Sequence, residues 1–273
     1  MFITEIKRVF SGSMFYVSVI ITLILLFYGI YDYAFASGFF PISEEILALG
    51  NTDPHLFNTF DAVLWSRIRV LSLPAPLLAA LPFAASLAID RNSLFLNSLL
   101  PRTNRTRYII SKFCVNGLAG GLALALPHII IYLIAYLIFP EGIITYEGQS
   151  RMNVTGSFTW LYESNPALYV WGVIGVTFLF GSAYASLGLL VSLISNNVYI
   201  ILASPFLFYI IPSVAFTTIA GANYWLPTVT WSIHLINNPS WSIILAELII
   251  IIVICATASI LYSFTHLQNL YVE

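Results

Sequence analysis

The sequence predicts an all-α membrane protein, a single transmembrane domain over residues 1–273 with six transmembrane helices. Hydrophobic residues make up 59% of the chain and charged residues only 8%. An average soluble domain carries about 25% charged residues, so this composition excludes a water-exposed surface of ordinary kind. A helix of roughly 20 apolar residues crosses about 30 Å of hydrocarbon. Six stretches meet that requirement, at about residues 14–36, 70–89, 109–139, 168–194, 198–219 and 242–265.

The first ten residues, MFITEIKRVF, alternate apolar and polar positions. The apolar members of the pattern fall on one side: Phe2, Ile3, Ile6, Val9 and Phe10. This predicts a short interfacial helix that lies on the membrane before the first span, and a frayed terminus is the alternative. The following apolar run is too long for the core of a signal peptide and lacks a small-x-small cleavage site, so we expect it to be retained.

The basic residues predict the orientation. If the N-terminus is cytoplasmic, seven of them fall on the inner side and three on the outer side. The inner set is Lys7, Arg8, Arg91, Arg102, Arg105, Arg107 and Lys112, and the outer set is Arg67, Arg69 and Arg151. This asymmetry follows the positive-inside rule and predicts that both termini face the cytoplasm, with the chain in the cytoplasmic membrane.

Half of the ten basic residues lie in DRNSLFLNSLLPRTNRTRYIISK, which covers the loop between the second and third expected spans and the start of the third span. Asp90 is a suitable N-cap for a helix. Leu94, Phe95 and Leu99 would then share one face, and Pro101 would end the helix. The pattern predicts a short amphipathic helix beside a basic strip. It could rest on anionic lipid headgroups or dock onto a cytoplasmic protein, and the residues alone leave both open.

Sequence motifs for catalysis are absent. The chain has only two lysines and neither follows a glycine, so a nucleotide-binding P-loop is impossible. It has no H-E-x-x-H and no G-x-S-x-G, and its four histidines show no ligand spacing. We therefore expect no catalytic residue, no metal site and no cofactor in this chain, no enzymatic activity and no nucleic-acid partner.

Two polar residues inside the expected spans are candidates for a functional role. Glu247 lies about one and a half turns into the last span, and an intramembrane carboxylate is a functional candidate by default. The alternative, which we favour, is a structural carboxyl near the outer interface. His128 follows Pro127 in the third span, where it marks a kink more readily than a proton relay.

The segment between the fifth and sixth spans, GANYWLPTVTWSIHLINNPSW, is too polar and proline-rich to cross a membrane. It carries Trp225, Trp231 and Trp241, and such aromatic residues prefer the membrane interface. We expect short re-entrant or interfacial helices on the outer side, with an ordinary interfacial loop as the alternative.

This layout resembles the permease subunits of type-2 ATP-binding-cassette exporters. The shared features are the interfacial N-terminal helix, six spans and a basic loop between spans two and three. The loop motif of that family is matched here by Asp90, Leu100-Pro101-Arg102, Arg105, Arg107-Tyr108 and Lys112.

The resemblance implies that this loop carries a cytoplasmic coupling helix, which sits in a groove on a separate ATPase subunit that binds ATP and Mg. The coupling residues would be Asp90, Leu94, Phe95, Leu99, Arg102 and Arg105. It also implies that re-entrant helices around Trp225 and Trp231 help to close the pathway on the outer side.

A six-span chain encloses little volume, so we expect a second permease subunit, identical or related, at the pathway. The apolar lining favours an amphiphilic substrate such as a peptide, a lipid or a hydrophobic drug. The alternatives are a secondary transporter or channel without an ATPase, a membrane enzyme, and a regulatory or sensor subunit that does not conduct.

Overall fold

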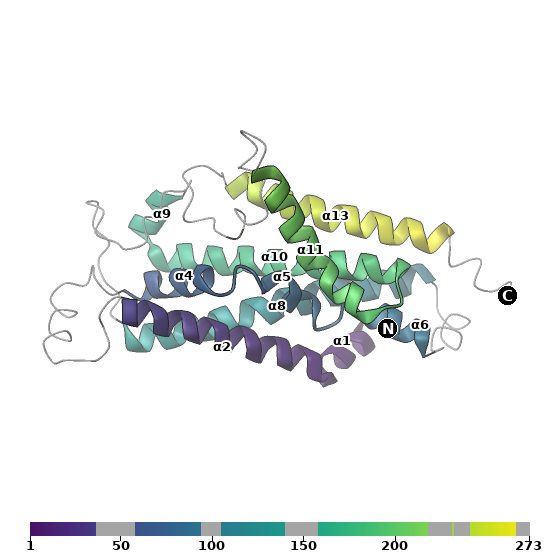
Figure 1. The fold of residues 1–273 in the computed structure, drawn as a ribbon, viewed down its shortest axis with the longest axis horizontal. Helices are drawn as coiled ribbons and strands as arrows, with labels where there is room; N and C mark the ends of the chain where they lie inside the picture. The colour runs from purple at the N-terminus through teal and green to yellow at the C-terminus, as the bar shows by residue number, and fades with distance from the viewer. Residues whose placement is uncertain (37–57, 94–104, 140–157, 218–230, 232–240, 266–273) are drawn as a thin grey trace, which may run out of the picture.

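The computed structural model describes residues 1–36, 58–93, 105–139, 158–217, 231 and 241–265. Within these ranges the regular structure is helical. Five helices are long and apolar enough to cross a membrane. They are α2 (Ser13–Ala36), α8 (Arg105–Ile138), α10 (Pro166–Ile194), α11 (Val198–Thr217) and α13 (Trp241–Thr265). The chain is therefore a helical membrane protein, and these helices match five of the six expected spans. Of these helices, α2, α8, α10 and α13 run along one axis, and α11 is inclined to them (Figure 1).

The expected second span, residues 70–89, is not one continuous helix. Three short helices cover this region and the residues beside it: α4 (Thr59–Arg69), α5 (Ala75–Ala80) and α6 (Ser86–Asn92). Turns separate them at 70–74 and 81–85. Pro74, Pro76 and Pro82 lie in or beside these turns, and each lacks the N–H that a continuous helix needs. The three helices follow one another along the bundle (Figure 1), so the count of six spans stays a prediction.

The centre of the bundle is a close crossing of α8 and α10. A Cβ atom on Gly120 would lie 2.8 Å from the Gly181 carbonyl oxygen and 2.7 Å from that of Ala79 in α5. A side chain at this crossing is therefore excluded, and small residues let the backbones approach as they do in membrane helices. Two hydrogen bonds reinforce the pair, Asn116 Nδ2 to the Ala185 carbonyl at 2.7 Å and Ser182 Oγ to the Gly117 carbonyl at 2.9 Å.

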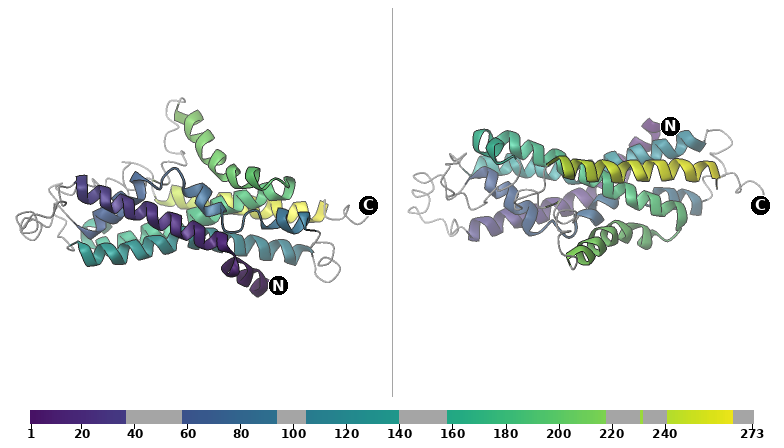
Figure 2. Two further views of the ribbon diagram at one scale, coloured as in Figure 1. Left: turned by 60° about the horizontal axis from the view of Figure 1, so that its bottom comes forward. Right: turned by 90° about the horizontal axis from the view of Figure 1, so that it is seen from above.

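One end of the bundle, here called the α1 end, gathers several helix termini. The helix α1 (Phe2–Ser11) lies there, with the end of α6, the start of α8 and the end of α10 (Figure 1). Figure 2 shows α1 turning away from the axis of α2 and α11 leaning out from the other helices. The predicted N-terminal helix is thus confirmed as a helix. Val9 is buried and Ile3 is exposed, while its place on a membrane surface stays a prediction.

The turn between α10 and α11 is only Ser195-Asn196-Asn197, and it reverses the chain (Figure 1). A further short helix, α9 (Thr159–Ser164), precedes α10. The Asn165 side chain accepts a hydrogen bond from the Leu168 amide and so caps the start of α10.

Candidate functional site

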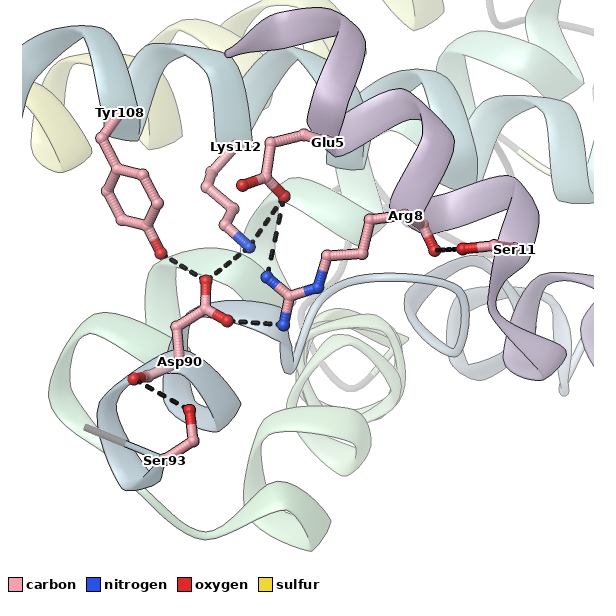
Figure 3. A network of polar contacts seen from close by, with 7 residues as sticks. All are labelled: Glu5, Arg8, Ser11, Asp90, Ser93, Tyr108 and Lys112. Atoms are coloured by element: carbon pink, nitrogen blue, oxygen red, sulfur yellow. Dashed lines mark hydrogen bonds and ion pairs between the residues drawn. The ribbon is translucent and has the colours of Figure 1, made fainter. Parts of the chain in front are cut away.

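Five side chains form an ion cluster at the α1 end: Glu5, Arg8, Asp90, Tyr108 and Lys112 (Figure 3). Asp90 is at its centre. Its carboxylate accepts from the Tyr108 hydroxyl at 2.6 Å, lies 2.8 Å from Lys112 Nζ and pairs with Arg8 Nη2. Lys112 Nζ also lies 3.0 Å from Glu5 Oε2. The cluster therefore joins α1, α6 and α8 through one carboxylate and one ammonium group.

Charge balance makes this burial possible. Asp90 is 0% exposed and Lys112 only 1% exposed, and the two acids offset the two bases. Burial raises the pKa of Asp90, but the Arg8 hydrogen bond and the Lys112 charge outweigh burial and hold that pKa below its usual range. The hydrogen bond to Asp90 raises the pKa of Arg8. The Asp90–Arg8 pair is thus ionised across the physiological pH range.

Helical spacing explains how the sequence builds the cluster. Glu5 and Arg8 are three residues apart on α1, and Tyr108 and Lys112 are four apart on α8, so each pair shares a helix face. Asp90 is inside α6, whose last residue is Asn92. The prediction that Asp90 caps a following helix is therefore wrong, because its carboxylate is used by side chains of α1 and α8. The sequence did carry a signal for the cluster. Glu5 and Arg8 before Asp90, and Tyr108 and Lys112 after it, are polar pairs at helical spacing.

Arg91, the neighbour of Asp90, points to another element. Its Nη1 donates to the Leu193 carbonyl at 2.7 Å, and its Nη2 donates to the carbonyls of Ser192 and Ser195. These are carbonyls at the C-terminus of α10, where a cation is favoured by the helix dipole. Asn92 adds a bond to the Asn196 carbonyl at 3.3 Å. The end of α6 is thus fixed to the turn between α10 and α11 as well as to α1 and α8.

Only part of the predicted coupling segment is described. Asp90 lies in the ion cluster, and Arg105 begins α8. The predicted coupling residues Leu94, Phe95, Leu99 and Arg102 fall outside the described residues.

A second polar cluster, the arginine–tryptophan cluster, consists of Arg67, His128, Thr177 and Trp231 in the bundle core. The Arg67 guanidinium carbon is 4.1 Å from the Trp231 ring centre, and its Nε donates to Thr177 Oγ1 at 3.2 Å. Arg67 Nη1 donates to the Trp231 carbonyl, and Trp231 Nε1 donates to the Arg67 carbonyl at 3.1 Å. Arg67, which the charge count assigns to the outer side, belongs to α4 and is 1% exposed, while its side of the membrane stays a prediction.

The same cluster holds Trp231 inside the bundle, while its depth in the membrane stays a prediction. Its aromatic character predicts the membrane interface, but its side chain is fully buried against Phe180, with ring centres 4.8 Å apart. A cation on the ring face and a partner for the indole N–H explain this position. Trp225 falls outside the described residues.

His128 and Glu247 lie in different places. His128 is buried in α8, its Nδ1 is 2.7 Å from the Leu124 carbonyl, and its ring packs edge-to-face with that of Trp231, with centroids 6.3 Å apart. Glu247 is a half-buried residue of α13 near Tyr184. The structure thus assigns His128 a packing partner, while the roles of both side chains stay predictions. Among the described residues, no group of three or more His, Cys, Asp or Glu side chains could hold a metal ion.

Comparison with known proteins adds no relative. No protein-family model matches the chain, and neither does any curated protein or solved structure. The five long apolar helices are those of a membrane protein of the helical class.

Proposed function

We propose that this chain is the permease subunit of an ATP-binding-cassette exporter. In this proposal a separate ATPase drives alternating access, and an amphiphilic peptide, lipid or hydrophobic drug crosses the cytoplasmic membrane. The observation that carries the proposal is the anchoring of the basic loop at both ends. Asp90 and Arg91 precede residues 94–104, and Tyr108 and Lys112 follow them; all four have buried or half-buried partners on other elements.

This anchoring supports a route for mechanical coupling. A displacement of the loop would be passed to α1 through Arg8 and Glu5, and to the end of α10 through Arg91. Charge-assisted hydrogen bonds are short and directional, so they transmit displacement better than apolar contacts that can slide. ATP binding would then favour one arrangement of the helices, to the extent that the ATPase binds the two arrangements with different affinity.

The partners follow from the same proposal. ATP and Mg are bound by the ATPase, a second permease subunit completes the pathway, and both termini face the cytoplasm. The α1 end would be the cytoplasmic end, since Lys7, Arg8, Arg91 and Lys112 are all described there.

One observation favours a second candidate, a secondary transporter or channel that works without an ATPase. Arg67 is a cation buried in the core of the bundle, and intramembrane charges often mark an ion or substrate pathway. This candidate predicts transport by the purified chain in the absence of ATP and loss of that transport in Arg67→Gln.

The test of the first proposal separates docking from transmission. The tagged chain is purified from its native membranes, and a copurifying ATPase is identified by mass spectrometry. Phe95→Asp should lower ATPase recovery by about tenfold or more if Phe95 is an interface anchor. Replacing Arg105 and Arg107 together by Gln should reduce recovery less and in a salt-dependent manner.

Tyr108→Phe is the matched variant for transmission. It removes one hydrogen bond to Asp90 and leaves residues 94–104 unchanged, so ATPase recovery should stay normal while substrate-stimulated hydrolysis falls. Full recovery with Phe95→Asp, or the absence of any ATPase from the wild-type preparation, would contradict the proposal.

A further inference from the structure

A cavity of about 310 Å³ opens at the α1 end, between the α1–α2 junction, residues 81–89 and the start of α11. Most of its wall is apolar, including Phe83, Ile89 and Leu202. Three residues bring polar groups to it: Arg8, Ser13 and Ser86. An apolar cavity with a few convergent polar groups is the usual form of a small-molecule site.

Arg8 supplies a cation that is only partly used. Its Nη2 is engaged by Asp90, its Nη1 is 3.9 Å from Glu5, and its side chain is 39% exposed. A guanidinium has five N–H donors, so Arg8 retains donors for a second anion while its pair with Asp90 stays intact. The Asp90 carboxylate is fully buried and does not line the cavity.

Ser86 and the start of α2 supply further donors. Ser86 is 4% exposed, and its Oγ has no hydrogen-bond partner within the described part of the chain. A buried hydroxyl without a partner is costly, which points to a group that occupies the cavity. Ser13 begins the 24-residue helix α2, and the first turn of a helix leaves N–H groups that favour a phosphate.

We propose that this cavity binds the phosphate headgroup of an anionic glycerophospholipid. The phosphate lies between Arg8, Ser86 and the N-terminus of α2, and the first methylenes of an acyl chain contact Phe83, Ile89 and Leu202. The rest of the lipid continues into the bilayer, because Met14 and Ile89 are 54% and 47% exposed beside the cavity. The expected position of α1 at the membrane surface places Arg8 at headgroup depth. The site does not depend on the proposed transport function.

The first experiment is native mass spectrometry of the purified chain with phosphatidylglycerol or phosphatidylcholine. We expect phosphatidylglycerol to bind about tenfold more tightly, because it keeps a net negative charge opposite Arg8. Leu202→Trp fills the cavity and should weaken phosphatidylglycerol binding about tenfold. Leu207→Trp is the matched control, since Leu207 is an exposed residue of the same helix that does not line the cavity.

The second pair of variants tests the headgroup. Arg8→Lys keeps a positive charge beside Asp90 but loses the planar fork, and it should reduce the preference for phosphatidylglycerol several-fold. Lys7→Gln removes an exposed charge of the same helix outside the cavity, and it should change binding less than twofold. Equal losses in the two variants would show a nonspecific effect of charge and overturn the site.

Phosphatidylglycerol with a photoreactive group near the start of the acyl chain tests the wild-type chain directly, whatever the folding of the variants. Labels on residues 81–89 and 198–202 would support the site, and labels confined to α13 would overturn it. Competition by soluble glycerophosphoglycerol at the same concentration as the lipid would also overturn it, because the apolar wall would then contribute nothing.

Discussion

Lys112 and Arg67 are both basic side chains only 1% exposed, yet the two regions accommodate the charge in opposite ways. Lys112 lies within 3.0 Å of two carboxylates, those of Asp90 and Glu5. Arg67 has no ion pair with a carboxylate among the described residues; it uses a carbonyl, a hydroxyl and the face of Trp231. The first region neutralises its cation, whereas the second disperses the charge over polar and aromatic groups.

The chemistry of the two side chains explains the difference. An ammonium is a compact, strongly hydrated charge that needs an anion when it is buried, whereas a guanidinium is planar, weakly hydrated and stacks on aromatic rings. The two substitutions therefore leave different groups unpaired. Removing Lys112 leaves carboxylates with too few cations, whereas removing Arg67 leaves only neutral polar groups without a donor.

The largest expected effect is that of Lys112→Met. Breaking a buried ion pair by removing one partner costs about 3–5 kcal/mol, because an uncompensated charge stays buried. We expect a loss of this size in the free energy of unfolding, measured by denaturant titration in mixed micelles. Lys7→Met, at an exposed position of α1, is the control and should unfold like the wild type.

A double variant sharpens this prediction. Glu5→Gln removes one of the carboxylates that Lys112 balances, so Lys112→Met with Glu5→Gln should be more stable than Lys112→Met alone. If the single variant unfolds like the wild type, the ion cluster does not hold α1 to α6 and α8.

The second effect is smaller. Arg67→Met leaves the Trp231 carbonyl and the Thr177 hydroxyl without this donor, which should cost about 1–3 kcal/mol. Arg67→Lys should be no more stable than Arg67→Met. An ammonium lacks the planar, forked donors of the guanidinium and cannot stack on the Trp231 ring. The same unfolding titration measures both. A loss greater than that of Lys112→Met would break the comparison and reveal an anion bound to Arg67.

The smallest effect concerns pH. The pKa of Asp90 is depressed in the folded chain, so its stabilising contribution is fully present above the unfolded pKa of about 3.9 and is lost as pH falls through the lower folded value. The stability advantage of the wild type over Asp90→Asn should therefore stay constant from pH 7 to pH 5 and shrink only below about pH 4. Thermal unfolding followed by size-exclusion chromatography measures this difference, and an advantage that vanishes between pH 7 and pH 5 would show a raised pKa.

The long spans were predictable from the sequence because their cause is local. An apolar run of sufficient length forms a helix in a membrane whatever it packs against, so the run expected at 14–36 corresponds to α2 (Ser13–Ala36) and that at 168–194 to α10 (Pro166–Ile194). The N-terminal helix followed from helical periodicity in the same way. The second expected span does not form one continuous helix, because its prolines interrupt it. The average hydrophobicity of the segment does not show where those turns fall.

The clusters depended on the tertiary structure, because a charge in a sequence does not reveal its partner. Glu5, Asp90 and Lys112 are distant in sequence and meet only where α1, α6 and α8 come together. In the sequence Arg67 was only one of three basic residues on the expected outer side, and the structure shows it buried in the core with Trp231 on its guanidinium. The sequence by itself determined which long helices are apolar enough to cross a membrane, since that depends on composition and length. Only the tertiary structure decided which charges are buried and how each is balanced, because that depends on side chains up to 164 residues apart.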